Sequence, residues 1–323
     1  MSDCLLITVS ELLRRHGINI SPWMCLGLSE GYDFNYWIEK NIKIPMLVMT
    51  GKSKNEKKLF DNLGVQYQLI NEDTDLESTV MQRKNVIVNV DRYYLDYLSK
   101  RFGRTHFGQH AILLSEGDEY SYTCFDALDN TVDSLSKDVV AMARASKIQP
   151  FPPNHEGFYI LQNRAVKLTG TVVSMAIKRN MDAFLHSKDH GISRLESFIG
   201  QLELILSMIG VGNYAKYFDV QIDFLCKYIR EFESTKSFYR YAYEEFLKEA
   251  RESYSLPIEN CIKMCVQLGD AWYRMGEDLI SYRHQNDSAT VKLKQIADSL
   301  RTIVELERRF AEELSAACTK DGY

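Results

Sequence analysis

The sequence predicts an α+β domain followed by an all-α helical bundle domain. Three observations indicate this. Short apolar runs typical of strands alternate with helical patterns up to about residue 145, a proline-rich stretch at 150–155 predicts a linker, and almost every later segment has helical periodicity. A chain of 323 residues is long enough for two domains of ordinary size. We predict that they cover residues 1–148 and 149–323.

The segment CLLITVSELLRRHG predicts a helix over residues 5–16. Its apolar residues recur at helical spacing, Glu11 and Arg15 form an i,i+4 pair, and Gly17 suits the position after a helix end. A second helix is predicted to begin at Pro22, because proline is favoured at the first helical position. The next segment, LSEGYDFNYW at 28–37, is predicted to be a loop.

The middle of the first domain is predicted to alternate strands and helices, at 44–50, 55–62, 65–70, 73–84 and 86–90. HAILLSE (110–116) and YSYTCFDA (120–127) then predict a β-hairpin that closes through Gly117-Asp118-Glu119. The order of these elements favours a mostly antiparallel α+β fold over a doubly wound one.

Long amphipathic stretches fill the second domain, at 164–187, 191–210, 214–232, 236–252, 257–284 and 288–317. Helices of this length and number favour a bundle. We expect this helical domain either to shape a pocket for an acceptor or to mediate formation of a homodimer.

Composition argues against several classes of function. The net charge is −5, so no nucleic acid partner is expected. No run approaches the roughly 20 apolar residues of a membrane span, and the start of the chain lacks the basic segment of a signal peptide. The seven cysteines are odd in number and irregularly spaced, which favours reduced thiols. We therefore expect a cytoplasmic protein with no membrane partner.

No cofactor and no metal site are expected. The sequence has neither a P-loop nor a dinucleotide-binding fingerprint. Cys261 and Cys265 lie four residues apart, but no pair of His or Cys partners stands near them in sequence. We interpret both as small apolar residues on a helix face.

Cys4 stands at the start of the first predicted helix. A helix N-terminus leaves N–H groups unpaired and carries partial positive charge, which stabilises a thiolate. The alternative interpretation is a small apolar residue that fills space, since free cysteine is often buried. From this position alone, both interpretations stay open.

His110 and Asp126 lie near the open end of the predicted hairpin, on paired strands. An imidazole there can hydrogen-bond a carboxylate. Cysteine, then histidine, then Asp or Asn along the chain is the papain-like arrangement of nucleophile, base and orienting group. His106, in the loop before the strand, is the rival base, and Asp129 is the rival for Asp126.

Several longer segments resemble the butirosin biosynthesis protein H family. In the first domain they are CLLITVSELLRRHGINIS, LGLSEGYDFNYW, VIVNVDRYYLDYL and HFGQHAILLSEGDEYSYTCFDALD. In the second they are FYRYAYEEFLKEARE and LGDAWYRMGEDLI. The resemblance covers most of the chain, and the order of the segments makes it specific although no single motif is sufficient.

This resemblance implies a papain-like catalytic domain related to C39-like cysteine enzymes. The named member of the family transfers an acyl group from an acyl carrier protein to an aminoglycoside amine. Carried over by residue, it implies Cys4 as nucleophile, His110 as general base and Asp126 as orienting acid. The implied partners are an acyl or peptidyl carrier protein, with its phosphopantetheine thioester, and a small-molecule amine acceptor.

Five further residues are candidates for substrate binding: Asp91, Tyr93, Tyr94, Tyr32 and Asn35. Asp91 lies in VDRYYLDY, which also matches the family pattern, and Tyr93 and Tyr94 follow a strand end where pocket residues often lie. Tyr32 belongs to the aromatic segment 28–37, which either walls an acyl channel or is a packed loop. Asn35 is a candidate oxyanion donor.

The leading hypothesis is a cysteine-dependent acyltransferase that moves an acyl group from a carrier-protein thioester to an amine, through an acyl-Cys4 intermediate, in the biosynthesis of an antibiotic or a nonribosomal peptide. The alternative is a cysteine hydrolase, either a peptidase or a thioesterase, with the same three residues. A non-catalytic binding protein that keeps the fold is a third hypothesis, which an intact Cys4, His110 and Asp126 argues against.

Overall fold

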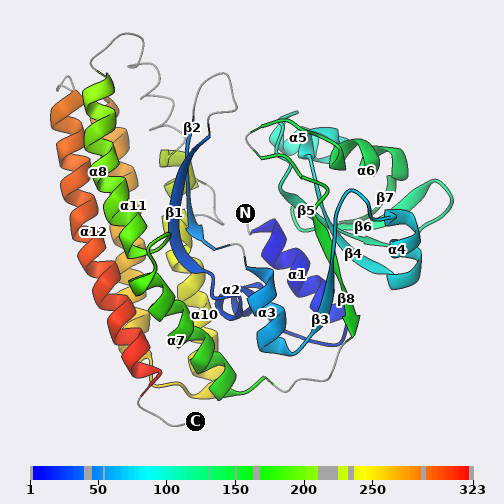
Figure 1. The fold of residues 1–323 in the computed structure, drawn as a ribbon, viewed down its shortest axis with the longest axis horizontal. Coiled ribbons are helices and arrows are strands. Elements are labelled where there is room, and N and C mark those ends of the chain that lie inside the picture. The colour runs from blue at the N-terminus through cyan, green and yellow to red at the C-terminus, as the bar shows by residue number, and fades with distance from the viewer. Residues whose placement is uncertain are drawn as a thin grey trace. The chain divides into compact units, whose positions relative to one another are not determined.

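The computed structural model describes residues 3–39, 46–53, 55–129, 131–149, 151–162, 168–209, 225–231, 236–284 and 289–319 (Figure 1). The chain folds as two compact units. The first comprises Met1–Cys25 and Phe60–Lys167, and the second comprises Leu26–Leu59 and Leu168–Tyr323. The mixed α+β class is confirmed, with a sheet-rich first unit and a mostly helical second one.

A six-stranded sheet forms the centre of the first unit, in the order β3-β8-β4-β5-β6-β7. Every pairing in it is antiparallel. The strands are β3 (Gln66–Ile70), β4 (Asn85–Val90), β5 (His110–Ser115), β6 (Ser121–Asp126), β7 (Thr131–Ser136) and β8 (Gly157–Gln162). The predicted hairpin is thus confirmed as β5 and β6.

Helices cover both faces of this sheet. On one face, Val88 of β4 and Ile112 of β5 pack with Val80, Leu98 and Val140. Those three belong to helices on that face, α4 (Leu76–Arg83), α5 (Asp96–Phe102) and α6 (Lys137–Arg144). Because side chains alternate along a strand, the neighbouring residues of β4 and β5 point to the opposite face. There they meet α1 (Cys4–Arg15), which packs against both strands. The short helix η1 (Arg92–Tyr94) also belongs to the first unit, whereas α2 (Pro22–Leu28) and α3 (Glu56–Leu63) each contain residues of both units.

The predicted boundary after residue 148 differs from the division into compact units. Strand β8 lies beyond the proline-rich stretch, yet it pairs with both β3 and β4. Its apolar residues are therefore part of the first core, although their sequence lies between a predicted linker and a predicted helix. Sequence patterns also missed α5, β7 and α6.

Five long helices dominate the described part of the second unit (Figure 1). They are α7 (Gly170–His186), α8 (Ile192–Ile209), α10 (Arg240–Tyr254), α11 (Glu259–His284) and α12 (Ala289–Ala317). Helix α12 packs against α7, α8 and α11. No helix within the described ranges is long and apolar enough to cross a membrane. Most of the predicted helix 214–232 lies outside the described residues, and the part that is described contains η2 (Lys227–Glu231). A short turn, η3 (Lys236–Tyr239), precedes α10.

The prediction of a loop at 28–37 was wrong, because most of this segment is strand β1 (Tyr32–Glu39). It pairs antiparallel with β2 (Met46–Lys52) in a two-stranded ribbon of the second unit. Tyr32, Phe34 and Tyr36 alternate along β1 and are all at least 96% buried. Their aromatic side chains pack against helices of the same unit, so the second unit is helical with one β-ribbon.

A buried polar network connects this ribbon to the helices. Arg240 and Glu307 are both fully buried, and Arg240 Nε donates to Glu307 Oε1 over 2.8 Å. Glu307 also accepts from Trp272 Nε1 at 2.7 Å and from the Tyr32 hydroxyl. Arg240 Nη1 donates to the carbonyl of Asp33 at 2.9 Å. One carboxylate, that of Glu307 on α12, therefore connects residues of β1, α10 and α11.

We predict that Glu307→Gln lowers the free energy of unfolding by about 3 kcal/mol, because it leaves the buried Arg240 charge without its counter-ion. Urea denaturation measures the change. Glu196→Gln is the matched control, since the Glu196–Arg308 pair is largely exposed and its loss costs less than about 1 kcal/mol. Equal effects of the two substitutions would contradict the assigned role of Glu307.

Candidate active site

Cys4 is the first residue of α1. The helix begins here because Asp3 caps it: the Asp3 carboxylate accepts from the Leu6 N–H over 3.0 Å. The N–H groups of Cys4 and Leu5 belong to the first turn and have no intrahelical acceptor. The Cys4 thiol therefore lies at the positive end of the helix dipole, beside N–H groups of the first turn.

Two contacts align α1 with β5. The Thr8 hydroxyl donates to the carbonyl of Ala111 over 3.3 Å, one helical turn after Cys4. At the other end, Arg15 Nη1 donates to Ser115 Oγ over 2.5 Å and to Asn85 Oδ1 over 3.0 Å. The start of α1 therefore lies at the start of β5, where His110 is the first residue.

His110 is 1% exposed and forms a close pair with a carboxylate. Its Nε2 lies 2.7 Å from Asp126 Oδ2. Asp126 also accepts from the Tyr97 hydroxyl and from the N–H of Leu128, each over 2.8 Å. The carboxylate is thus held from three sides, and the imidazole is fixed in orientation.

The pKa values follow from this arrangement. Burial opposes a charged imidazole, but the hydrogen bonds to Asp126 and to Cys4 outweigh it and raise the pKa of His110 to about 10. Burial likewise opposes a charged carboxylate, yet His110 and the other donors lower the pKa of Asp126. Since Nε2 faces Asp126, the other ring nitrogen, Nδ1, is left for Cys4.

The structure thus places the Cys4 thiol beside the His110 imidazole, which pairs with the Asp126 carboxylate. Asp129 lies in the turn after β6, where its N–H donates to the Asp126 carbonyl over 3.2 Å. The catalytic roles of the three residues stay a prediction.

Asp91 lies at the same edge of the sheet, because Val90 pairs with His110 across β4 and β5. It is 1% exposed. Its Oδ2 lies 2.7 Å from His106 Nδ1 and accepts from Ser146 Oγ over 2.6 Å. Its Oδ1 accepts from the N–H groups of Phe107 at 2.9 Å and Tyr93 at 3.1 Å. Burial opposes its charge, but these donors, Ser146 foremost, lower the pKa of Asp91.

Two family models match this chain. The one described as "Butirosin biosynthesis protein H, N-terminal" matches residues 3–127, and the one described as "Domain of unknown function (DUF4872)" matches residues 138–314. The chain belongs to the butirosin biosynthesis protein H family. Membership implies a role in antibiotic biosynthesis. No curated protein matches the chain.

In this member of the butirosin biosynthesis protein H family, His106 pairs with Asp91 and not with Asp126. The His106 ring stacks on Tyr93, with 4.1 Å between centroids and 12° between planes. Tyr94 meets the same ring edge-on at 6.3 Å. Sequence reasoning treated His106 only as a rival of His110, and it missed Ser146. The Asp91–His106 spacing of 15 residues carries no local signal for such a pair.

The predicted linker at 150–155 contacts the chain segment that leads into β5 at this site. The Gly108 N–H donates to the Phe151 carbonyl over 2.7 Å. A Cβ atom at Gly108 would lie 2.3 Å from Pro153 Cδ, so only glycine permits this close approach. Gly108 lies midway between His106 and His110, and the contact therefore positions the loop that carries His106 and leads into β5 at His110.

Tyr32 and Asn35 lie in the second unit. Tyr32 is 2% exposed, and its hydroxyl donates to Glu307. Asn35 Oδ1 accepts from the N–H of Tyr36 at 2.8 Å and from Arg194 Nε at 3.2 Å. These contacts favour packing over the wall of an acyl channel for Tyr32, and they occupy the Asn35 carbonyl.

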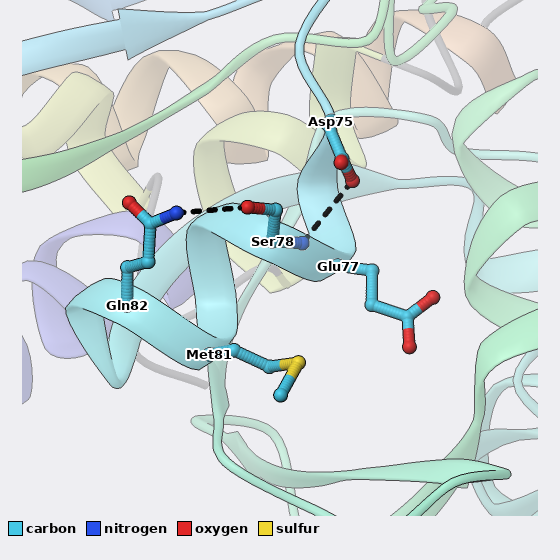
Figure 2. Close-up of a pocket in the computed structure, with 5 residues that line it drawn as sticks. All are labelled: Asp75, Glu77, Ser78, Met81 and Gln82. Atoms are coloured by element: carbon cyan, nitrogen blue, oxygen red, sulfur yellow. Dashed lines mark hydrogen bonds between the residues drawn. The ribbon is translucent and has the colours of Figure 1, made fainter.

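A shallow pocket on α4 contains none of the predicted site residues (Figure 2). Figure 2 shows Asp75 Oδ1 accepting from the Ser78 N–H at 3.1 Å and Gln82 donating to Ser78 Oγ at 2.9 Å. These are helix-capping and intrahelical contacts.

Cys261 and Cys265 are both buried on α11.

We predict that Cys4→Ala lowers the pKa of His110, because it removes a side chain whose interactions with the ring stabilise the imidazolium. Histidine-selective ¹⁵N NMR follows the titration, and Cys318→Ala is the control. A folded pKa near 10, above the ordinary value of 6.5, also means that the charged ring stabilises the fold below pH 6.5. That contribution is lost as the pH rises toward 10. An unchanged His110 titration in Cys4→Ala would contradict the contact.

We also predict that iodoacetamide at neutral pH alkylates Cys4 before Cys318. The two thiols are matched in being half-buried, whereas the other five are buried. Burial raises the pKa of Cys318 to about 11, which suppresses its thiolate, while Cys4 lies beside an imidazolium and a helix N-terminus. Peptide mass spectrometry after short labelling times measures the order, and faster labelling of Cys318 would refute the activation of Cys4.

Proposed function

We propose that this protein is a cysteine-dependent acyltransferase, which moves an acyl group from a carrier-protein thioester to an amine through an acyl-Cys4 intermediate. The observation that carries the proposal is the His110–Asp126 pair at the start of β5, with the Cys4 thiol at the start of α1 beside it. A thiol beside an oriented imidazole is the arrangement required for nucleophilic catalysis by cysteine. Membership in a family named for butirosin biosynthesis supports a biosynthetic role.

In the first half-reaction, the Cys4 thiolate attacks the carbonyl carbon of the thioester. A tetrahedral intermediate forms, and its oxyanion finds donors in the first-turn N–H groups of α1. The bond between the carbonyl carbon and the carrier sulfur then breaks. The His110 imidazolium gives its proton to the departing sulfur, which leaves as a thiol, and Cys4 carries the acyl group. Asp126 stabilises the imidazolium and fixes the ring that donates.

In the second half-reaction, the amine nitrogen attacks the acyl-Cys4 carbonyl and forms the amide as the carbon–sulfur bond to Cys4 breaks. A proton from the attacking nitrogen returns to His110. This restores the imidazolium beside the Cys4 thiolate, where the cycle began. A thioester is already activated toward attack, so this chemistry needs no ATP and no cofactor.

Two partners are implied by this chemistry. The donor is an acyl or peptidyl carrier protein whose phosphopantetheine arm bears the thioester, and the acceptor is a small-molecule amine. The same three residues also support hydrolysis if water in place of the amine reaches acyl-Cys4. The fate of the acyl-enzyme therefore distinguishes an acyltransferase from a thioesterase.

We predict a mass increase of one acyl group on Cys4 when the protein is incubated with acyl-pantetheine thioesters, free or attached to a carrier protein. Intact-mass spectrometry detects the adduct, and peptide mapping locates it. Cys4→Ser should abolish it, and His110→Gln should slow its formation on the order of 100-fold, since general acid–base groups typically contribute that much or more.

Cys318→Ser is the control and should load normally. Loading that persists in Cys4→Ser would overturn the mechanism. Rapid release of free acid in the presence of an amine, without amide, would show a hydrolase instead.

A further inference from the structure

The first unit contains a second histidine–aspartate pair, His106–Asp91, beside the proposed catalytic chain. The two pairs differ in one respect that matters for chemistry. His110 is 1% exposed, its Nε2 is held by Asp126, and the Cys4 thiol lies beside the ring. The His106 side chain is 34% exposed, and only its Nδ1 is held by Asp91.

The surroundings of His106 fix its ring with Nε2 outward. Asp91 binds Nδ1, which makes Nε2 the basic nitrogen of the neutral ring. Tyr93 stacks on one face of the ring. No residue within the described ranges hydrogen-bonds Nε2. Four donors in turn hold Asp91, so its carboxylate is fixed before any substrate arrives.

Both pairs lie at one edge of the sheet. Val90 pairs with His110, and Asp91 follows Val90 directly. The Arg92 N–H donates to the carbonyl of Phe107 over 3.0 Å, so the chain beyond β4 stays beside the loop that leads into β5. The Arg92 guanidinium interacts electrostatically with both Cys4 and Asp91. The His106–Asp91 pair therefore lies at the same strand ends as His110.

The number of protons released when an amine is acylated indicates what a second base would do at this site. An aliphatic amine is an ammonium ion at neutral pH, with a pKa of about 10. Its reaction with acyl-Cys4 forms a C–N bond, breaks the C–S bond and yields an amide, the Cys4 thiolate and two protons. His110 accepts one and becomes the imidazolium of the resting pair. The other proton must leave the ammonium before attack, because a protonated nitrogen has no lone pair.

We propose that His106, oriented by Asp91, is the second general base of the transfer reaction and removes the first proton from an ammonium acceptor. This inference rests on the proposed function and assigns the acceptor class, a basic aliphatic amine. Water already has a lone pair, so hydrolysis needs no proton to leave before attack: His110 accepts one proton as the thiolate departs, and the carboxylic acid product then loses its own proton to solvent. The second pair thus separates transfer to an amine from hydrolysis.

The test uses the full chain loaded with acyl from the N-acetylcysteamine thioester, with two acceptors, butylamine and methoxyamine. Butylamine is an ammonium ion at pH 7, whereas methoxyamine is largely neutral and loses only one proton on acylation. His106→Asn keeps a donor for Asp91 but has no basic nitrogen. We expect it to load Cys4 at the wild-type rate, to transfer to butylamine on the order of 100-fold more slowly and to transfer to methoxyamine unchanged.

His155→Asn is the matched control, since this histidine is half-buried in the same unit and its positive φ of 54° suits asparagine. It should leave both rates unchanged. Equal transfer to both amines by His106→Asn, at the wild-type rate or equally slowed, would overturn the role of His106. Failure of the wild-type protein to form acyl-Cys4 would instead overturn the proposed function, so the loading step and the acceptor comparison identify which of the two is wrong.

Discussion

The register of β5 with its neighbours is the constraint on which the candidate site depends. Val90 opposite His110 brings the end of β4 to the start of β5, and the β5–β6 pairing brings Asp126 to the same edge. A shift of one residue would turn His110 to the other face of the sheet and remove it from Asp126 and Tyr97. Helix α1 then completes the arrangement, because Thr8 and Arg15 align it with β5 so that Cys4 lies at the edge where His110 begins the strand.

Burial and charge act together at this edge. His110 and Asp126 are removed from water, which would disfavour each charge alone, and their mutual hydrogen bond reverses that effect for both. Hydrogen bonds likewise lower the pKa of Asp91 despite its burial, but its partner His106 stays partly exposed to solvent. One sheet edge therefore carries a shielded imidazole beside Cys4 and an accessible imidazole. The division of work that we propose for the two similar pairs rests on this difference in exposure.

Stability in the second unit follows a different principle. Its helices are amphipathic, but polar contacts select how the helices and the β-ribbon pack together. Glu307 accepts hydrogen bonds from Arg240, Trp272 and Tyr32, which come from three separate elements. Removing any one of these side chains leaves another buried charge or donor without its hydrogen bond in an apolar environment. Tyr32 and Asn35 are part of this packing, which explains why an aromatic segment that resembles the wall of a pocket is a buried strand.

Short-range patterns in the sequence predicted the helix at Cys4, the β5–β6 hairpin and the helical periodicity of the second half, and the order of residue types along the chain made Cys4, His110 and Asp126 candidates. Contacts between residues far apart in the chain emerged only from the folded structure. It placed β8 inside the first sheet, made a strand of 32–39, and paired His106 with Asp91 and Ser146. Periodicity and turn signals act over a few residues, whereas strand partners and buried ion pairs are selected by which surfaces meet when the core closes.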